Sequence, residues 1–373
     1  MSESDQKANP EASNPEALIS LRDQIDALDT EVLGLLNQRA GLAMEVARVK
    51  KDDDPAAIFY RPEREAQVLR RIKEKNTGPM PDDAAAKLFR EIMSVCLSLE
   101  DPQRVAFLGP IGTFTEAAAL KHFGKAALTT ALPTISDVFR EVEAGSATYG
   151  VVPVENSSEG VVNHTLDRFM SSSLSIIGEV ELRIHHHFLV GQSTKVDAIS
   201  KVYSHQQSLA QCRHWLDTHY PAAERVAVSS NAEAARRVGS EWHSAAIAGS
   251  SAAQNYELTA LFSNIEDNPE NTTRFLIVGS APVAASGTDK TSIVVSAADK
   301  AGALLDILKP LAARGISLTS IETRPAKPDK WAYVFFIDLL GHASDPHICE
   351  ALGEIRSNTK NVRVLGSYPR AVI

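Results

Sequence analysis

The chain has 373 residues, of which 44% are hydrophobic and 23% are charged, and its net charge is −9. This length is enough for two to four domains, and the composition is that of an ordinary soluble protein. The acidic balance argues against a general nucleic-acid-binding protein, and no apolar run reaches the roughly 20 residues of a membrane-spanning helix. Three cysteines lie far apart without a CxxC pair, which indicates free thiols and a cytoplasmic location.

The first hundred residues predict a polar leader followed by three helices. Residues 1–16 contain two prolines and no apolar core, so we expect a disordered leader and not a signal peptide. From Leu18 to Lys50 apolar residues recur at helical spacing, which predicts one helix about 50 Å long. Shorter helices are predicted from near Pro62 to Lys75 and from Pro81 to about Glu100. The first helix is too long for the other two to cover, so we expect a second chain to cover part of it.

Three cations are spaced along the first helix. Arg39 and Lys50 are eleven residues apart, close to three turns, and therefore share a face. Arg22 lies about 100° round the axis from them and is better placed to serve the site of a second chain than its own. The alternative is that all three are ordinary surface residues of a helix.

The three helices resemble the chorismate mutase domain at the front of bifunctional chorismate mutase–prephenate dehydratases, in which two chains interlace to form two sites. The resemblance implies that the partner's Arg22 joins same-chain ligands of the substrate's carboxylates, ether oxygen and hydroxyl. It lies in Leu21-Arg22-x-x-Ile25-x-x-Leu28-Asp29, Leu35-Leu36-x-x-Arg39, Glu45-Val46-x-x-x-Lys50 and Arg64-Glu65. The same-chain ligands that it implies are Arg39, Lys50, Arg64 and Glu65.

Three positions depart from the most familiar form of this family. Cys96 stands where a serine is common, and Glu100 stands where a glutamine donates to the ether oxygen. Arg61 falls where an acidic residue can occur, so its role stays open. A carboxyl group donates only when protonated, so we expect Glu100 to be desolvated, with a pKa well above the ~4.3 of a free glutamate. The alternative is a solvated residue in the last helical turn.

Beyond the short linker at Asp101–Gln103, strand and helix patterns alternate over about 180 residues, which predicts two α/β lobes around a cleft. The glycine turn at 109–112 lacks both GxGxxG and a Walker lysine, so it is interpreted as a helix start that approaches a carboxylate. Val180–Val190 is strand-like. Its three consecutive histidines, His185 to His187, would alternate between the faces of a strand, so we expect no metal site and no cofactor.

Four motifs in order resemble the prephenate dehydratase domain over about residues 104–280. The resemblance implies a fold like the type-2 periplasmic binding proteins and a reaction in which prephenate loses carbon dioxide and hydroxide. Thr273 would assist the departing hydroxyl. Arg274 would hold a carboxylate or, alternatively, make a structural ion pair. The motifs are Gly109-Pro110-x-Gly112-Thr113-Phe114, Pro153-Val154-Glu155-Asn156-Ser157, Ser204-His205-x-Gln207-x-x-x-Gln211-Cys212 and Asn271-x-Thr273-Arg274-Phe275. The other implied substrate-binding residues are Thr113, Asn156, Ser204, Gln207, Gln211 and Phe275.

After a linker at 281–289, the pattern predicts a βαββαβ unit of the ferredoxin-like type. The predicted elements are Thr291–Ser296, Ala301–Ala313, Ile316–Thr323, Trp331–Leu339, Pro346–Ser357 and Val362–Ser367. Two motifs in it resemble those of ACT regulatory domains, which bind phenylalanine where two subunits meet. Thr323 replaces the usual serine. The implied effector-binding residues are Gly302, Ala303, Leu304, Glu322, Arg324 and Pro325. The alternative is an ACT fold kept only for assembly.

The sequence therefore predicts a multidomain enzyme: an all-α mutase domain at 17–101, an α/β dehydratase domain at 104–280 and an α+β ACT domain at 290–373. It would convert chorismate to prephenate and then to phenylpyruvate, under feedback by L-phenylalanine, as a homodimer or higher oligomer. A small-molecule sensor is one alternative. A dehydratase whose helical domain serves only assembly is another.

Overall fold

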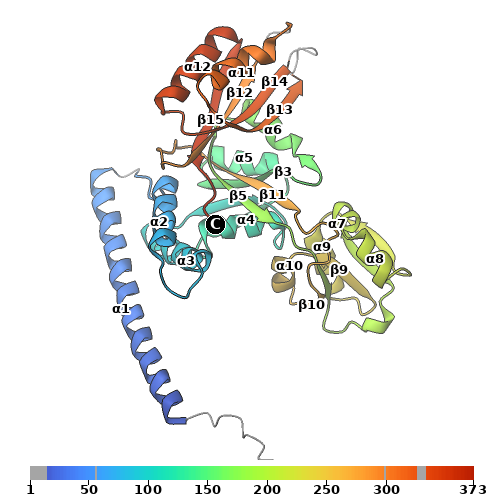
Figure 1. Cartoon of the computed structure of the whole chain (residues 1–373). Helices are drawn as coiled ribbons and strands as arrows, with labels where there is room; N and C mark the ends of the chain where they lie inside the picture. Colours follow the sequence, from blue (N-terminus) through green and yellow to red (C-terminus); the bar gives the residue numbers. More distant parts are fainter. Residues whose placement is uncertain (1–14, 55–56, 298–299, 326–332) are drawn as a thin grey trace, which may run out of the picture. The chain divides into compact units, whose positions relative to one another are not determined.

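The computed structural model describes residues 15–54, 57–297, 300–325 and 333–373 (Figure 1). Within these residues, one compact unit takes in the chain up to Phe59 together with Leu99–Asp101. The other unit comprises Tyr60–Ser98 and Pro102–Ile373. Residues 1–14 of the predicted leader therefore lie outside the described residues. Trp331, where we predicted a strand to begin, also lies outside them.

Three helices form the N-terminal part of the chain, as predicted: α1 (Pro15–Asp53), α2 (Pro62–Lys75) and α3 (Asp82–Glu100). α1 begins at Pro15, inside the segment that we expected to be leader. Pro62 stands in the first turn of α2, where its missing N–H costs no helical hydrogen bond. α1 leaves its large apolar side chains exposed. They include Leu18, Leu21, Ile25, Leu28, Val32, Leu35, Leu42, Val46 and Val49.

The first α/β lobe is built on a sheet in the order β2-β1-β3-β11-β5, with the short β4 paired to β3. β1 pairs parallel to β2 and β3, whereas β11 runs antiparallel to both β3 and β5. The strands are β1 (Arg104–Leu108), β2 (Leu128–Leu132), β3 (Tyr149–Asn156), β4 (Gly160–Val161), β5 (Ser175–Arg183) and β11 (Thr272–Gly279). The helices are α4 (Phe114–Phe123), α5 (Ile135–Glu143) and α6 (Asn163–Ser171).

The second lobe has a sheet in the order β10-β6-β9-β7-β8. Its strands are β6 (His187–Val190), β7 (Lys201–His205), β8 (Glu224–Val228), β9 (Ser244–Ala248) and β10 (Thr259–Phe262). Its helices are η1 (Val196–Ala198), α7 (Gln206–Gln211), α8 (Arg213–His219), α9 (Asn231–Val238) and α10 (Ser250–Asn255).

The chain crosses between the two lobes twice. The predicted continuous strand Val180–Val190 is wrong, because β5 ends at Arg183 in the first sheet and β6 begins at His187 in the second. The return crossing runs from β10 to β11. Glu266 in the return crossing ties the two crossings together. Its Oε2 accepts from the His186 backbone N–H at 2.8 Å, and its Oε1 lies 2.7 Å from Nδ1 of His185.

The C-terminal domain has an antiparallel sheet in the order β13-β14-β12-β15, which confirms the ferredoxin-like prediction. α11 and α12 pack on a core of sheet residues, while apolar residues of β12, β14 and β15 share a second core with the first lobe. A Cβ at Gly366 would overlap the backbone of Ile176, so only glycine allows β15 this close to β5. The elements are β12 (Asp289–Ser296), α11 (Ala303–Ala313), β13 (Leu318–Pro325), β14 (Tyr333–Leu340), α12 (Pro346–Asn358) and β15 (Asn361–Pro369).

Candidate active sites and effector region

A cleft of about 580 Å³ lies between the two α/β lobes. Four helices, two from each lobe, begin at its wall: α4, α6, α7 and α9. The unpaired N–H groups of a helix start carry a partial positive charge, so their convergence makes the cleft attractive to anions. The residues that bring these helix starts to the wall are Thr113–Thr115, Val162–His164, Gln207–Ser208 and Ser229–Asn231.

The side chains of the cleft carry little formal positive charge. Among the lining residues, all of which belong to the described part of the chain, there is no arginine and no lysine. Glu159 is the one acidic residue in this set, and three histidines, His164, His186 and His205, also line the wall. A bound dianion would therefore rely on helix starts, amides and hydroxyls rather than on guanidinium groups.

Thr273 lies on β11, opposite Asn156 of β3 in the strand register. Nδ2 of Asn156 donates to Oγ1 of Thr273 at 2.7 Å and to Oδ1 of Asn271 at 3.0 Å. Oδ1 of Asn156 accepts from the backbone N–H groups of Ser158 and Glu159 at 3.0 Å. Both the oxygen and the nitrogen of the Asn156 carboxamide are therefore fixed by hydrogen bonds. The hydroxyl proton of Thr273 has no hydrogen-bond acceptor among the described residues. Thr273 is therefore oriented to donate into the cleft that it lines.

The second lobe contributes two glutamines of α7 to the cleft wall. Oε1 of Gln211 lies 2.9 Å from Nε2 of His186, whose ring packs edge-on against Phe114. Nε2 of Gln207 lies 3.5 Å from Oε2 of Glu159, which belongs to the first lobe. Both glutamines line the cleft, as does the buried ring of Phe275.

Two residues of the dehydratase motifs mainly support their neighbours. Ser204 is fully buried and does not line the cleft. Its hydroxyl lies 2.9 Å from Oδ1 of Asn231 and 2.7 Å from the Ile247 carbonyl oxygen, and its one proton can be donated to either oxygen. Thr113 lines the cleft and caps α4 by accepting from the Glu116 N–H at 3.4 Å. We expected the backbone N–H groups of the glycine turn to be free to bind a carboxylate of a ligand. For Gly112 this expectation is wrong. Its N–H donates to Oε2 of Glu116 at 2.6 Å, because the turn brings that side chain back onto it.

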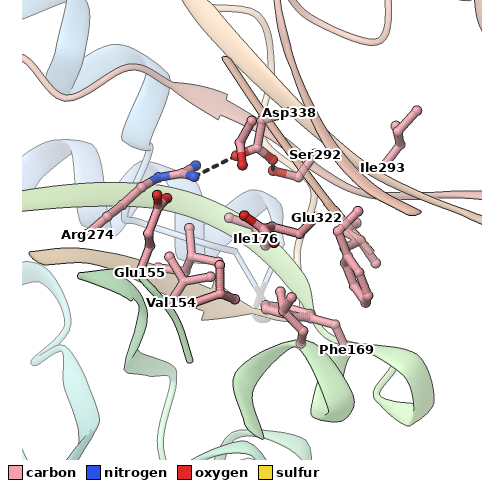
Figure 2. Close-up of a pocket in the computed structure, with 15 residues that line it drawn as sticks. Val154, Glu155, Phe169, Ile176, Arg274, Ser292, Ile293, Glu322 and Asp338 are labelled. Atoms are coloured by element: carbon pink, nitrogen blue, oxygen red, sulfur yellow. Dashed lines mark hydrogen bonds and ion pairs between the residues drawn. The ribbon is translucent and has the colours of Figure 1, made fainter. Parts of the chain in front are cut away.

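Arg274 points away from the cleft, since successive side chains of a strand face opposite sides. Its guanidinium meets Oε2 of Glu179 at 2.9 Å, Oδ2 of Asp338 at 2.6 Å and the hydroxyl of Tyr368 at 2.9 Å. Nζ of Lys290 joins the same Glu179 oxygen at 2.7 Å. Figure 2 shows Arg274 reaching Asp338, which also contacts Ser292. We call Arg274, Glu179, Asp338, Lys290 and Tyr368 the interdomain cluster, because it joins the first lobe to the C-terminal sheet.

The unit that contains α1 holds four of the predicted mutase residues: Arg22, Arg39, Lys50 and Glu100. Arg39 and Lys50 lie close enough to Glu100 to lower its pKa, but burial has the larger effect and raises that pKa above its usual value. This direction agrees with the expectation for Glu100. Arg22 is exposed and lies about 25 Å along the axis of α1 from Arg39, at 1.5 Å per residue.

The remaining mutase candidates belong to the other unit. Glu65 is half-buried beside Arg90 of α3, with 3.2 Å between Oε1 and Nε, and removal from solvent raises the pKa of Glu65. Nε of Arg61 lies 2.5 Å from Oε1 of the buried Glu63. Arg64 is exposed, and Cys96 is buried.

The predicted effector residues fall into two groups in the ACT domain. Gly302 takes a left-handed φ of 81° before α11, and Leu304 is exposed beside it. On β13, Glu322 lines a small cavity with Glu155 of the first lobe (Figure 2), and Nη2 of Arg324 lies 2.8 Å from Oδ1 of Asp167 in α6. Ala303 is half-buried and Pro325 is exposed.

The sequence analysis assigned no site role to two side chains that line the cleft, His186 and Asn231. His186 belongs to the histidine run, which was considered only as a metal site. Asn231 stands at a helix start, where asparagine is common, so no local signal separated it from an ordinary cap.

The fold and the cleft together define a multidomain protein with a two-lobed α/β ligand-binding cleft, a ferredoxin-like C-terminal domain and three N-terminal helices. Models of three families match the chain: prephenate dehydratase at residues 105–283, chorismate mutase type II at 21–101 and the ACT domain at 291–357. The bifunctional chorismate mutase/prephenate dehydratase of Stutzerimonas stutzeri is 58% identical over 97% of this chain and 100% of its own. That of Pseudomonas aeruginosa is 57% identical over the same shares.

A solved structure with the same fold is the prephenate dehydratase of Arthrobacter aurescens in complex with L-Phe. It has a TM-score of 0.67 and 37% identity, and the match covers 72% of this chain and 90% of that one. The chain belongs to the bifunctional chorismate mutase/prephenate dehydratase family. No helix among the described residues is both long and apolar enough to cross a membrane.

Proposed function

We propose that the cleft between the lobes binds prephenate and that Thr273 assists its ring hydroxyl to leave. The observation that carries this proposal is the 2.7 Å hydrogen bond from Asn156 to Oγ1 of Thr273, which leaves the hydroxyl proton free to donate. Threonine is a weak acid, so it acts as a hydrogen-bond donor whose contact strengthens as negative charge grows on the leaving oxygen.

The reaction needs no oxidant or reductant. The bond to the departing carboxylate breaks, its electron pair enters the ring, and the C–O bond breaks with both electrons on oxygen. The hydroxide combines with one proton taken up from the solution and leaves as water beside carbon dioxide, so the reaction consumes one proton. The driving force is aromatisation, so the cleft needs only to bind, orient and desolvate the substrate.

The two carboxylates of prephenate would bind at the starts of α4, α6 and α9, where backbone N–H groups and the helix dipole favour negative charge. The cleft wall lacks arginine and lysine, which supports this assignment. Gln207, Gln211 and Phe275 would complete the binding surface, with Thr113 as the cap of α4. Ser204 would act indirectly, by holding Asn231.

Two assays test this function. Purified protein should form phenylpyruvate from prephenate and should deplete chorismate in the absence of added prephenate. A chain that only senses small molecules would bind prephenate without turnover. A chain whose helices serve only assembly would turn over prephenate but leave chorismate unchanged.

For the mutase reaction, we propose a site formed by two copies of the chain. The exposed apolar residues of α1 support a partner that covers this helix. Arg39, Lys50 and Glu100 of one chain would bind chorismate together with Arg22 of the other, and bidentate arginines would hold its carboxylates in the folded conformer. By the resemblance to the mutase family, further same-chain ligands would be Arg61, Arg64, Glu65 and Cys96.

We propose that L-phenylalanine binds the ACT domain where two copies meet, at Gly302–Leu304 and Glu322–Pro325, and inhibits the dehydratase. β13 is an edge strand and leaves Leu318 and Ile321 exposed, which supports a second copy beside it. The interdomain cluster and the Arg324–Asp167 pair connect the ACT sheet to the first lobe. A movement of the ACT sheet on phenylalanine binding would therefore displace residues of that lobe. α6 is one route to the cleft, because its first residues line the cleft.

We further propose a cytoplasmic location and the domain limits predicted from sequence. The three cysteines are free thiols, two of them buried, which a reducing compartment maintains.

A further inference from the structure

His186 lies where the chain passes from the first lobe to the second, between β5 and β6. Its ring is 1% exposed and forms part of the cleft wall. Oε2 of Glu266 accepts a hydrogen bond from the backbone N–H of His186 at 2.8 Å. The ring of Phe114 packs edge-on against the His186 ring, with 5.6 Å between the ring centroids. The ring is therefore fixed in place on the segment that joins the two halves of the site.

The hydrogen bonds of His186 assign its tautomer. Nε2 lies 2.9 Å from Oε1 of Gln211, and a carboxamide oxygen only accepts, so Nε2 carries the proton. Burial lowers the pKa of His186 and outweighs the opposing effects of Gln211 and Glu266, so the ring is neutral near pH 7. Nδ1 then keeps a bare lone pair. This atom is buried and has no hydrogen-bond partner within the part of the chain that the structure describes.

A buried acceptor without a donor is unfavourable, and a catalytic role is one of the explanations for such an atom in a native structure. The carboxylates and the keto oxygen of prephenate are all acceptors near neutral pH. Its ring hydroxyl is the one O–H donor that it carries. We propose that Nδ1 of His186 accepts a hydrogen bond from the ring hydroxyl of prephenate, while Thr273 donates to the same oxygen. The proposal rests on the dehydratase activity assigned above.

This contact would orient the leaving group. With its hydrogen directed at His186, the hydroxyl oxygen turns a lone pair toward the proton of Thr273. The hydroxyl then departs between one acceptor and one donor, and His186 neither gains nor loses a proton. Phenylpyruvate carries no ring hydroxyl, so the same contact would favour substrate over product.

Two variants of this histidine separate its two nitrogens. In His186→Asn, the side-chain amide lies near the position of Nδ1, and its oxygen can still accept from the substrate. In His186→Gln, the amide reaches the position of Nε2 and keeps the bond to Gln211, but nothing replaces Nδ1. We expect kcat/KM for prephenate to fall about 100-fold in His186→Gln and less than about 10-fold in His186→Asn, in the range seen when one oriented hydrogen bond is removed. Phenylpyruvate should bind both variants as it binds the wild type.

His187→Gln is the matched control, because His187 is the next residue along the chain and does not line the cleft. Its dehydratase activity should stay near that of the wild type. Three results would overturn the proposal: a His186→Gln variant within about threefold of the wild type, equal losses in both variants, or weakened phenylpyruvate binding in parallel with lost turnover. Equal losses would assign His186 a purely structural role.

A measurement on the wild-type protein does not depend on the folding of any variant. The ¹⁵N NMR signals of the histidine rings, assigned through their bonds to the backbone signals of the labelled wild-type protein, should show a neutral His186 ring protonated at Nε2. A proton on Nδ1 would overturn the proposal. A wild-type protein that forms no phenylpyruvate would instead contradict the dehydratase activity itself.

Discussion

Nη1 of Arg274 donates to Oδ2 of Asp338 at 2.6 Å, so a strand of the catalytic lobe is bound directly to the ACT sheet. Thr273, its neighbour on β11, points the other way and lines the cleft. One strand therefore carries a catalytic candidate on one face and an interdomain contact on the other. A shift of the ACT sheet that moves Asp338 would act on the backbone that holds Thr273.

We expect Asp338→Asn to weaken inhibition by phenylalanine. The substitution keeps the shape of the side chain but removes the charge that attracts Arg274. The phenylalanine concentration for half inhibition should rise about 5- to 100-fold, the range of a typical coupling free energy, while kcat without phenylalanine changes little. Dose–response curves with prephenate as substrate measure this. Unchanged inhibition would remove the interdomain cluster from the regulatory route.

Replacing Arg274 itself should destabilise the protein. Arg274→Leu leaves Asp338 buried without its partner, and breaking a buried pair from one side costs about 3–5 kcal/mol of unfolding free energy. Urea unfolding followed by fluorescence measures the loss. Arg183→Leu, which removes an exposed partner of Glu270, is the control and should have a much smaller effect. Equal losses in the two variants would contradict this account of the cluster.

Thr273→Ala should lower the dehydratase kcat by about 100-fold or more, because it removes the donor that faces the leaving hydroxyl. Mutase activity should be unchanged. Thr272→Ala is a close control. Its hydroxyl donates to the Glu270 carbonyl at 3.2 Å and does not line the cleft, so this variant should keep normal turnover. Normal turnover in Thr273→Ala would refute the assigned role.

The mutase reaction should become faster toward acid pH. Burial raises the pKa of Glu100, so its protonated, hydrogen-donating form persists to higher pH than in a free glutamate. We expect kcat/KM for chorismate to rise as the pH falls from about 8 to about 5, toward this raised pKa. Glu100→Gln, a donor at every pH, should give a flat profile. A flat profile in the wild type would exclude the protonated carboxyl as the donor.

Arg22 and Arg39 allow a test of shared mutase sites. Arg22→Ala and Arg39→Ala should each lose most mutase activity as pure proteins. Mixed after unfolding and refolding together, they should recover about a quarter of wild-type activity, because half the dimers are mixed and each mixed dimer has one intact site. Recovery of nothing, with mixed dimers shown to form, would place both arginines in the site of one chain.

Local sequence patterns were sufficient for the class of fold and for the family. Helical periodicity predicted α2 and α3 almost to the residue, and the four ordered dehydratase motifs matched one family along the whole of their domain. Such patterns succeed because apolar spacing and turn residues depend on neighbours within a few positions. The strand through His185–His187 was wrong because its break arises from pairing with two different sheets, which no local spacing encodes.

The sequence by itself determined the domain order, the ACT topology and the importance of the stretch from Asn271 to Phe275. Only the tertiary structure decided which way the side chains of that stretch face. It directed Thr273 to the cleft and Arg274 to Asp338, and it brought His186 beside Gln211. Arg274, which we expected to be able to bind a substrate carboxylate, does not line the cleft, whereas the starts of four helices do. The physical reason is that hydrogen-bond partners and burial depend on segments that are distant in the chain, 25 residues apart for His186 and Gln211 and 64 for Arg274 and Asp338. These segments meet only when the sheets are assembled.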